Sequence, residues 1–153
     1  MPIYKLDFQT QINISPQVVY EHLSKPQNMV GLQPLLTHVE NIQHHEHNGK
    51  QSVSYNTVEA FRWLGLVIYK NRIQVQANFT NPPTQLNIVV YSFPNITADV
   101  EYRFTAQDGG TLVKETMQIQ VSAWLAKFVT SQANQAQTAL LANLKNRLEG
   151  KLK

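Results

Sequence analysis

One uninterrupted run, AWLAKFVTSQANQAQTALLANLKNRLE (residues 123–149), sets the architecture expected of the whole chain. It contains neither proline nor glycine, so it predicts one helix, about 40 Å long at 1.5 Å per residue. Apolar residues recur along it at steps of three and four, which puts them on one side of the helix. These residues are Leu125, Val129, Ala133, Ala136, Leu140 and Leu144, and the opposite side carries Lys127, Asn134, Thr138 and Lys145. Such a helix cannot bury its apolar side alone and needs a sheet wide enough to cover it.

The segments upstream of this helix supply the strands of such a sheet. Apolar and polar residues alternate in seven segments, at residues 3–14, 36–45, 51–63, 66–79, 84–93, 96–106 and 111–122. Strong turn signals stand at Asn48-Gly49 and at Asp108-Gly109-Gly110, and Asn81-Pro82-Pro83 is a firm break. Successive strands joined by short turns predict an antiparallel meander.

Two short helices are expected between the first and second strands. Ser15 can cap the first, and Pro16 suits its first turn, where the missing N–H of proline costs nothing. Pro26 ends this helix, and a second helical piece covers about residues 27–32. The predicted fold class is therefore α+β. It is a helix-grip fold in which a seven-stranded antiparallel sheet wraps a long C-terminal helix, with two short helices between strands 1 and 2.

Composition excludes several classes of function. The formal net charge is +3, but the lysines and arginines form no basic block, so no nucleic-acid partner is expected. The absence of cysteine excludes disulfides, thiolate metal sites and a cysteine nucleophile. No apolar run approaches the ~18 residues that span a bilayer, and residues 1–11 do not read as a signal peptide. We expect a cytoplasmic protein without stable membrane insertion, in the form of a monomer or weak dimer.

The face of the sheet expected to meet the helix mixes polar side chains with aliphatic ones. A closed core would penalise each unsatisfied polar group there by a few kcal/mol. Opposite this face the middle of the helix is small, at Ala133 and Ala136, and the resulting space suits water or a mostly apolar ligand. The residues expected to bind that ligand are Tyr55, Glu59, Phe61, Tyr69, Asn71, Ile73, Tyr102, Glu115, Met117, Phe128, Gln132 and Ala136. The alternative is that the tyrosine hydroxyls reach the rim and the two glutamates pair with arginine or backbone donors.

An apolar hairpin tip, Trp63 to Leu66, is a second candidate for function. Hairpin tips are usually polar because they are exposed to water. This one could gate a cavity mouth, make transient contact with a membrane or dock a protein partner, or it could fold down over the edge of the core.

Other chemistry finds little support in the sequence. The His44-His45-Glu46-His47 cluster, with His38 upstream, adjoins the Asn48-Gly49 turn and lacks further ligands, so no metal site is predicted. There is no nucleophile motif, phosphate-binding loop or dinucleotide fingerprint, so no cofactor is expected. An enzymatic interpretation would depend on Glu59 or Glu115 as a general base with a pKa raised by burial. Catalytic residues stay unassigned.

Several motifs resemble the START/Bet v 1-like (SRPBCC) superfamily, in its polyketide cyclase/dehydrase and lipid-transport branch. They are residues 14–20 (ISPQVVY), the Pro34 region, residues 81–86 (NPPTQL), Phe104 with residues 108–112 (DGGTL), and residues 140–149 (LLANLKNRLE). The usual tryptophan after the helix pair is absent, since Leu32-Gln33-Pro34 stands there. The resemblance implies one ligand-binding domain over residues 1–153, with an apolar cavity under the C-terminal helix.

Three functions follow as hypotheses. The first is binding or carriage of a hydrophobic small molecule, such as a lipid, a quinone or a polyketide-like compound, in an internal cavity. The second is a cyclase or dehydratase that acts on a polyketide-like substrate in that cavity. The third is a protein or membrane interaction module that uses the Trp63–Leu66 tip.

Overall fold

A computed structural model describes residues 1–63 and 66–150, with side chains described outside residues 61–69. Its strands are β1 (Ile3–Ile12), β2 (Leu36–His47), β3 (Lys50–Trp63), β4 (Leu66–Asn81), β5 (Gln85–Ser92), β6 (Ile96–Gln107) and β7 (Gly110–Gln120). Its helices are α1 (Pro16–Ser24), the 3-10 helix η1 (Pro26–Met29) and α2 (Ala123–Leu148). The long helix, the seven strands and both short helical pieces agree with those predicted.

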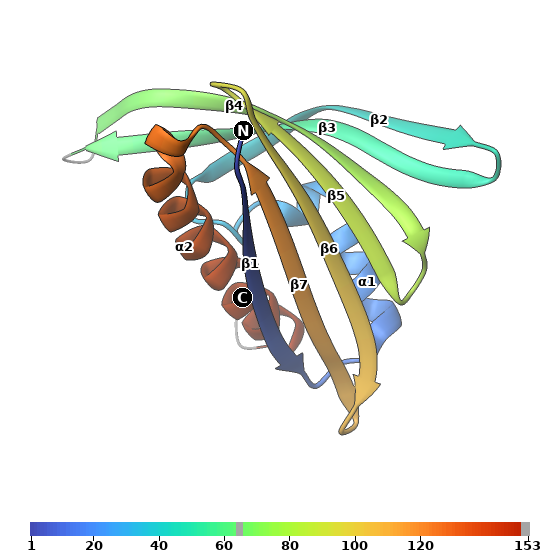
Figure 1. Ribbon diagram of the computed structural model, residues 1–153. Coiled ribbons are helices and arrows are strands. Elements are labelled where there is room, and N and C mark those ends of the chain that lie inside the picture. The colour runs from blue at the N-terminus through green and yellow to red at the C-terminus, as the bar shows by residue number, and fades with distance from the viewer. Residues whose placement is uncertain (64–65, 151–153) are drawn as a thin grey trace.

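The strands form one antiparallel sheet in the order β1-β7-β6-β5-β4-β3-β2. The first strand therefore pairs with the last, so that Tyr4 lies opposite Ile119. The sheet curves over α2, and α1 lies on the same side of the sheet, as Figure 1 shows. This arrangement confirms the predicted helix-grip fold.

The hairpin turns form where the sequence predicted them. Asn48 and Gly49 have φ of 51° and 77°, and Asp108 and Gly109 have φ of 51° and 78°. Two successive positive φ angles are typical of the tight turn whose twist matches that of the flanking strands. Gly110 is needed for a steric reason, because a Cβ there would lie 2.2 Å from the carbonyl oxygen of Ile12.

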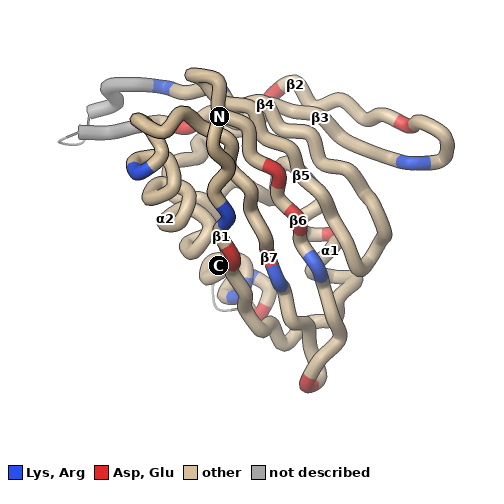
Figure 2. Tube along the Cα trace, in the orientation of Figure 1, with Lys and Arg blue, Asp and Glu red and all other residues tan. Residues whose placement is uncertain are grey.

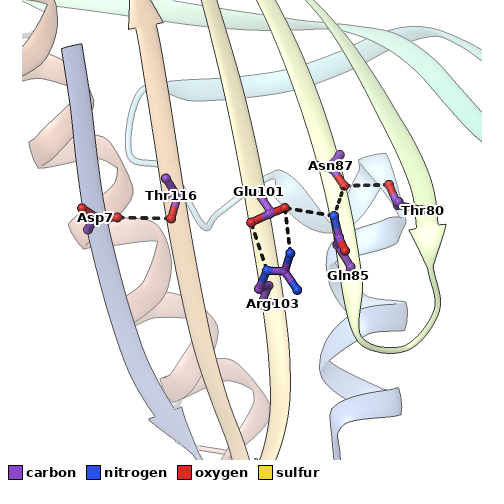
Figure 3. A network of polar contacts seen from close by, with 7 residues as sticks. All are labelled: Asp7, Thr80, Gln85, Asn87, Glu101, Arg103 and Thr116. Atoms are coloured by element: carbon purple, nitrogen blue, oxygen red, sulfur yellow. Dashed lines mark hydrogen bonds and ion pairs between the residues drawn. The ribbon is translucent and has the colours of Figure 1, made fainter.

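The two faces of the sheet differ in chemistry. In β7 the buried residues alternate with more exposed ones, and the buried side chains are Val113, Glu115, Met117 and Ile119. On the opposite face, Gln85 Nε2 donates to Glu101 Oε1 and to Asn87 Oδ1, at 2.9 Å in each case. Figure 3 shows these polar contacts running across the strands on the side away from the helices. The helix side therefore holds the core, as the alternation predicted.

Charged residues are spread over the molecule. In the view of Figure 2, lysine and arginine are interspersed with aspartate and glutamate along the strands and helices. Among the described residues no helix is long and apolar enough to span a bilayer.

Three local expectations differ from the structure. Ser15 occupies the N-cap position of α1, but its side chain makes no capping hydrogen bond. The second helical piece is the 3-10 helix η1, which ends at Met29 because Val30 already has an extended backbone. The helical spacing places Lys145 on the outer side of the long helix. Instead its Nζ donates to the carbonyl oxygen of Gln11 and lies 3.1 Å from Glu149 Oε2, because β1 passes beside this end of α2.

Candidate functional site

A cavity of about 520 Å³ lies between α2 and the concave face of the sheet. The helix contributes Leu125, Phe128, Val129, Gln132, Ala133, Ala136, Gln137 and Leu140. The sheet contributes Tyr55, Thr57, Glu59, Asn71, Ile73, Val75, Ile88, Val90, Ser92, Ile96, Ala98, Val100, Tyr102, Met117 and Ile119. The chain from the end of η1 to the first residue of β2 adds Met29, Gln33, Leu35 and Leu36, and the turn between β5 and β6 adds Phe93 and Pro94.

The space exists because α2 changes character along its length. Ala133 and Ala136 present only methyl groups to the sheet, and both line the cavity. Further along, Leu140, Leu141 and Leu144 are buried. The larger side chains therefore close the core at one end of the helix, while the alanines leave it open toward the other.

Hydrogen bonds from the C-terminal part of α2 hold one wall of the cavity in place. Arg147 donates to the carbonyl oxygens of Asn28 at 2.6 Å and Val30 at 2.9 Å. Asn143 Nδ2 donates to the carbonyl oxygen of Leu32 at 2.8 Å. These bonds fasten the segment after η1, and the flanking residues Met29 and Leu36 face the cavity.

Two exposed aromatic side chains stand at the edge of the cavity. Phe93 is 78% exposed and Phe128 is 61% exposed, yet both line the cavity. Trp124, one turn before Phe128 on α2, is 80% exposed. Because Phe93 and Phe128 reach both solvent and the interior, we take this edge as the mouth of the cavity.

A cluster of buried polar side chains lies at the end of the cavity away from Phe93 and Phe128. Tyr55, Tyr102 and Gln137 line the cavity there and are all buried. The Tyr102 hydroxyl donates to Gln137 Oε1 at 3.4 Å. The low polarity of the surroundings disfavours ionisation, and burial raises the pKa of Tyr55 to about 12. Both tyrosines therefore act as neutral hydrogen-bonding groups.

Glu115 lies against this polar group without lining the cavity. It stands opposite Tyr102 in the pairing of β6 with β7, and it is 1% exposed. Neither of its carboxylate oxygens has a hydrogen-bond partner among the described side chains. Burial raises the pKa of Glu115 to about 8, and the nearby Tyr102 hydroxyl opposes this rise only in part. The carboxyl group is therefore mostly protonated at neutral pH.

Glu59 is placed differently. It is half-buried on β3, it lines the cavity, and burial raises its pKa. Three strands, β4, β5 and β6, separate it from Glu115 on β7, so the two acids do not form a catalytic pair. Glu59 lies opposite Asn71 in the pairing of β3 with β4. Asn71 Nδ2 donates in turn to Ser92 Oγ at 3.2 Å.

Most residues predicted to bind a ligand do face this one cavity. They are Tyr55, Glu59, Asn71, Ile73, Tyr102, Met117, Phe128, Gln132 and Ala136. Glu115 does not line the cavity; it stands beside Tyr102 in the pairing of β6 with β7, and its part in ligand binding stays a prediction. The side chains of Phe61 and Tyr69 lie outside the described residues, as does the Trp63–Leu66 tip as a surface. The alternative in which tyrosine hydroxyls reach the rim fails for Tyr102, which is 2% exposed.

The sequence did not indicate the contributions of two irregular segments. One is the stretch Met29–Leu36 and the other is the turn with Phe93 and Pro94. Neither has a periodic pattern that would assign it a face. The one available signal was Phe93 itself, a large apolar residue in a turn, where polar residues are usual.

The histidine cluster shows no arrangement for a metal. His44, His45 and His47 are exposed near the end of the β2–β3 hairpin, and His45 Nε2 lies 2.9 Å from Ser54 Oγ. The described residues include no group of three or more histidine, aspartate or glutamate side chains placed to hold a metal ion.

Comparison with solved structures supports the fold. The protein TTHA0849 from Thermus thermophilus matches with a TM-score of 0.74 at 14% identity, over 98% of this chain and 100% of that chain. A START superfamily protein from Mycobacterium smegmatis matches with a TM-score of 0.74 at 11% identity, over 95% and 97% of the two chains. The Zhui aromatase/cyclase from Streptomyces sp. R1128 matches with a TM-score of 0.73 at 14% identity, over 99% and 97%. At such identities the similarity shows a shared fold, and it confirms the predicted START/Bet v 1-like architecture.

Sequence comparison gives a family without an activity. Residues 11–150 match the family model described as "Domain of unknown function (DUF7053)". No curated protein matches the chain.

Proposed function

Because the chain belongs to the DUF7053 family, whose description assigns no activity, we propose its function from the cavity: it binds or carries a hydrophobic small molecule there. The observation that carries this proposal is the cavity itself. Its volume of about 520 Å³ falls within the ~300–1,000 Å³ typical of small-molecule sites. A space of this size lined mainly by apolar side chains favours an apolar occupant, because burial removes apolar surface from water.

The class of ligand follows from the walls. Apolar side chains of the sheet and helix cover most of the surface, with a few polar groups among them. Lipids, quinones and polyketide-like compounds share this pattern of an apolar body with one or two polar atoms. The START superfamily protein and the aromatase/cyclase that share the fold are consistent with such a ligand, although the identities are low.

Native mass spectrometry and titration with the apolar dye Nile red test the proposal. We expect freshly purified protein to carry a small molecule or, once delipidated, to bind Nile red. Ala136→Phe should weaken Nile red binding by about tenfold or more, because its ring would occupy the cavity. The matched control is Ala142→Phe on the exposed side of the same helix, which should bind as the wild type does. Absence of any bound molecule and of dye binding would refute the proposal.

A cyclase or dehydratase is a second candidate because of Glu59. It is the carboxylate among the described lining residues, and burial raises its pKa toward the range useful for a general base. Glu59→Gln should then abolish turnover of a polyketide-like substrate and leave Nile red binding unchanged. Unchanged turnover in this variant would remove Glu59 from any such mechanism.

A further inference from the structure

The deep end of the cavity is built differently from the mouth, because several buried polar side chains line it. At the deep end Tyr102 donates to Gln137 Oε1, which leaves the Gln137 amide NH₂ group without a partner among the described residues. The Tyr55 hydroxyl beside it makes no hydrogen bond with the described residues either. Two unengaged hydrogen-bonding groups therefore face the deep end of an otherwise apolar space. Buried polar groups of this kind cost stability unless something pairs with them.

The Tyr102 hydroxyl fixes the orientation of the Gln137 amide. It donates to Gln137 Oε1, so the Gln137 N–H groups are the donors left for the cavity. Glu115, which is 1% exposed, stands beside Tyr102 in the pairing of β6 with β7. An acceptor oxygen on a ligand satisfies the Gln137 N–H group.

The charge of the head group distinguishes the candidate ligands. The described lining contains no lysine, arginine or histidine, so a carboxylate head group would have no counter-ion there. A buried ion without a partner is strongly disfavoured. An ammonium head would instead need an ionised carboxylate at the deep end, and Glu115 is mostly neutral at neutral pH. An uncharged acceptor such as a hydroxyl, a ketone or an ester avoids both costs.

The length of the cavity sets the length of the ligand. Nine residues separate Phe128 at the mouth from Gln137 at the deep end, which is about 13 Å along a helix. We propose that the deep end, formed by Tyr55, Tyr102 and Gln137, recognises the uncharged oxygen head group of an elongated amphiphile whose chain extends toward Phe93 and Phe128. This inference rests on the proposed function and specifies its ligand class.

The test compares three ligands with the same chain and different heads: decanol, decanoate and decylamine, each displacing Nile red at about pH 6.5. We expect decanol to bind at least about tenfold more tightly than either ion. Tyr102→Phe should weaken decanol binding by about five- to tenfold, because no hydroxyl then orients the Gln137 amide, and should leave the binding of decane unchanged. The matched control is Tyr20→Phe, which removes another buried hydroxyl, bonded to the carbonyl oxygen of Gln85, away from the cavity. That control should bind decanol as the wild type does.

The outcomes separate the two proposals. Tighter binding of decanoate or decylamine, or decanol binding that Tyr102→Phe leaves unchanged, would overturn the head-group inference while dye binding still supports a hydrophobic cavity. If neither the dye, decane nor decanol binds, the proposed function itself fails.

Discussion

The two halves of α2 differ in how many of their side chains are buried. In residues 137–148 the side chains of Gln137, Leu140, Leu141 and Leu144 are buried, the first two at the deep end of the cavity. Asn143 and Arg147 fasten neighbouring segments. In residues 123–136 the only buried residue is Ala126, and the side chains that face inward line a cavity. One continuous helix therefore combines a packed half with a half that leaves space.

This difference shows how a small domain can hold a cavity and stay folded. A void forfeits dispersion contacts along its lining, and the remaining core must supply the stability. Here the packed half of α2 supplies it, and it also holds the wall around Leu32 through Asn143. Changes in the packed half should therefore act on stability, and changes in the cavity half should act on binding.

The largest effect is expected at Glu115, which stands beside Tyr102 at the deep end of the cavity. Its pKa is about 8 in the folded protein and near 4.5 when unfolded, so the folded state binds more protons between these pH values. Stability from this group is therefore complete below about pH 4.5 and is lost as pH rises through about 8. The loss should be on the order of 5 kcal/mol in total, by linkage, with most of it falling between about pH 5 and pH 9. Urea unfolding from about pH 5 to pH 9 measures it.

Glu115→Gln is the variant that isolates this contribution. Glutamine stays neutral, so the variant should resemble the wild type near pH 5 and become more stable than it by pH 9. Parallel pH profiles of the two proteins would contradict the burial of an unpaired carboxyl at this position.

Leu144→Ala tests the packed half directly. Leu144 is fully buried, and truncation of such a leucine costs about 2–5 kcal/mol because a new cavity forms. Leu125→Ala is the matched control in the cavity half, where the side chain already borders empty space, and it should cost under about 1 kcal/mol. Equal losses of unfolding free energy in the two variants would show that the halves do not differ.

Much of the fold follows from patterns that repeat. Period-two alternation in residues 111–122 identified the buried face of β7, and Asn48-Gly49 identified a hairpin turn. In β3 the alternation is less informative, because Val58 and Ala60 on the second face are buried too. Because helical spacing fixes which residues share a side, Leu125, Val129 and Ala136 were assigned to the inner side of α2 correctly. Regular elements thus reveal their inner faces from sequence alone.

The site is only partly predictable, for a physical reason. Alternation predicts that Glu115 points inward, but whether it reaches the cavity depends on the curvature of the sheet and on its neighbours, here Tyr102 on β6. Phe93 and Leu36 enter the cavity from segments whose position depends on distant contacts, such as the bonds from Arg147. Such contacts have no local sequence pattern.

Arg147→Gln tests the fastening of the cavity wall by the packed half. Arg147 donates to the carbonyl oxygens of Asn28 and Val30, and hydrogen bonds from a charged donor contribute about 1.5–3 kcal/mol. We expect a loss of about 1.5 kcal/mol in urea unfolding, because part of the side chain is exposed. Arg147→Lys is the control: it keeps the charge but cannot reach both carbonyls with a planar fork, so it should lose nearly as much. Full recovery by lysine would show that charge alone matters.

The smallest expected effect concerns His22, which faces Arg147 at the end of the packed half. The guanidinium can only donate, so His22 Nε2, 3.2 Å from Arg147 Nη1, must accept and must be unprotonated. Burial, and then the charges of Arg147 and Lys25, lower the pKa of His22 from its ordinary value of 6.5. Its contribution to stability is therefore present above pH 6.5 and is lost as pH falls through the lowered pKa. Partial exposure keeps this loss below about 1 kcal/mol.

Glu115 titrates with the opposite sign over part of the same pH range, so the His22 measurement needs the Glu115→Gln background. In that background, urea unfolding should show a decline in stability between about pH 7 and pH 5. Adding His22→Gln, which keeps an acceptor for Arg147 but cannot gain a proton, should flatten the decline. An equally steep decline in the double variant would show that the loss of stability at low pH does not come from protonation of His22.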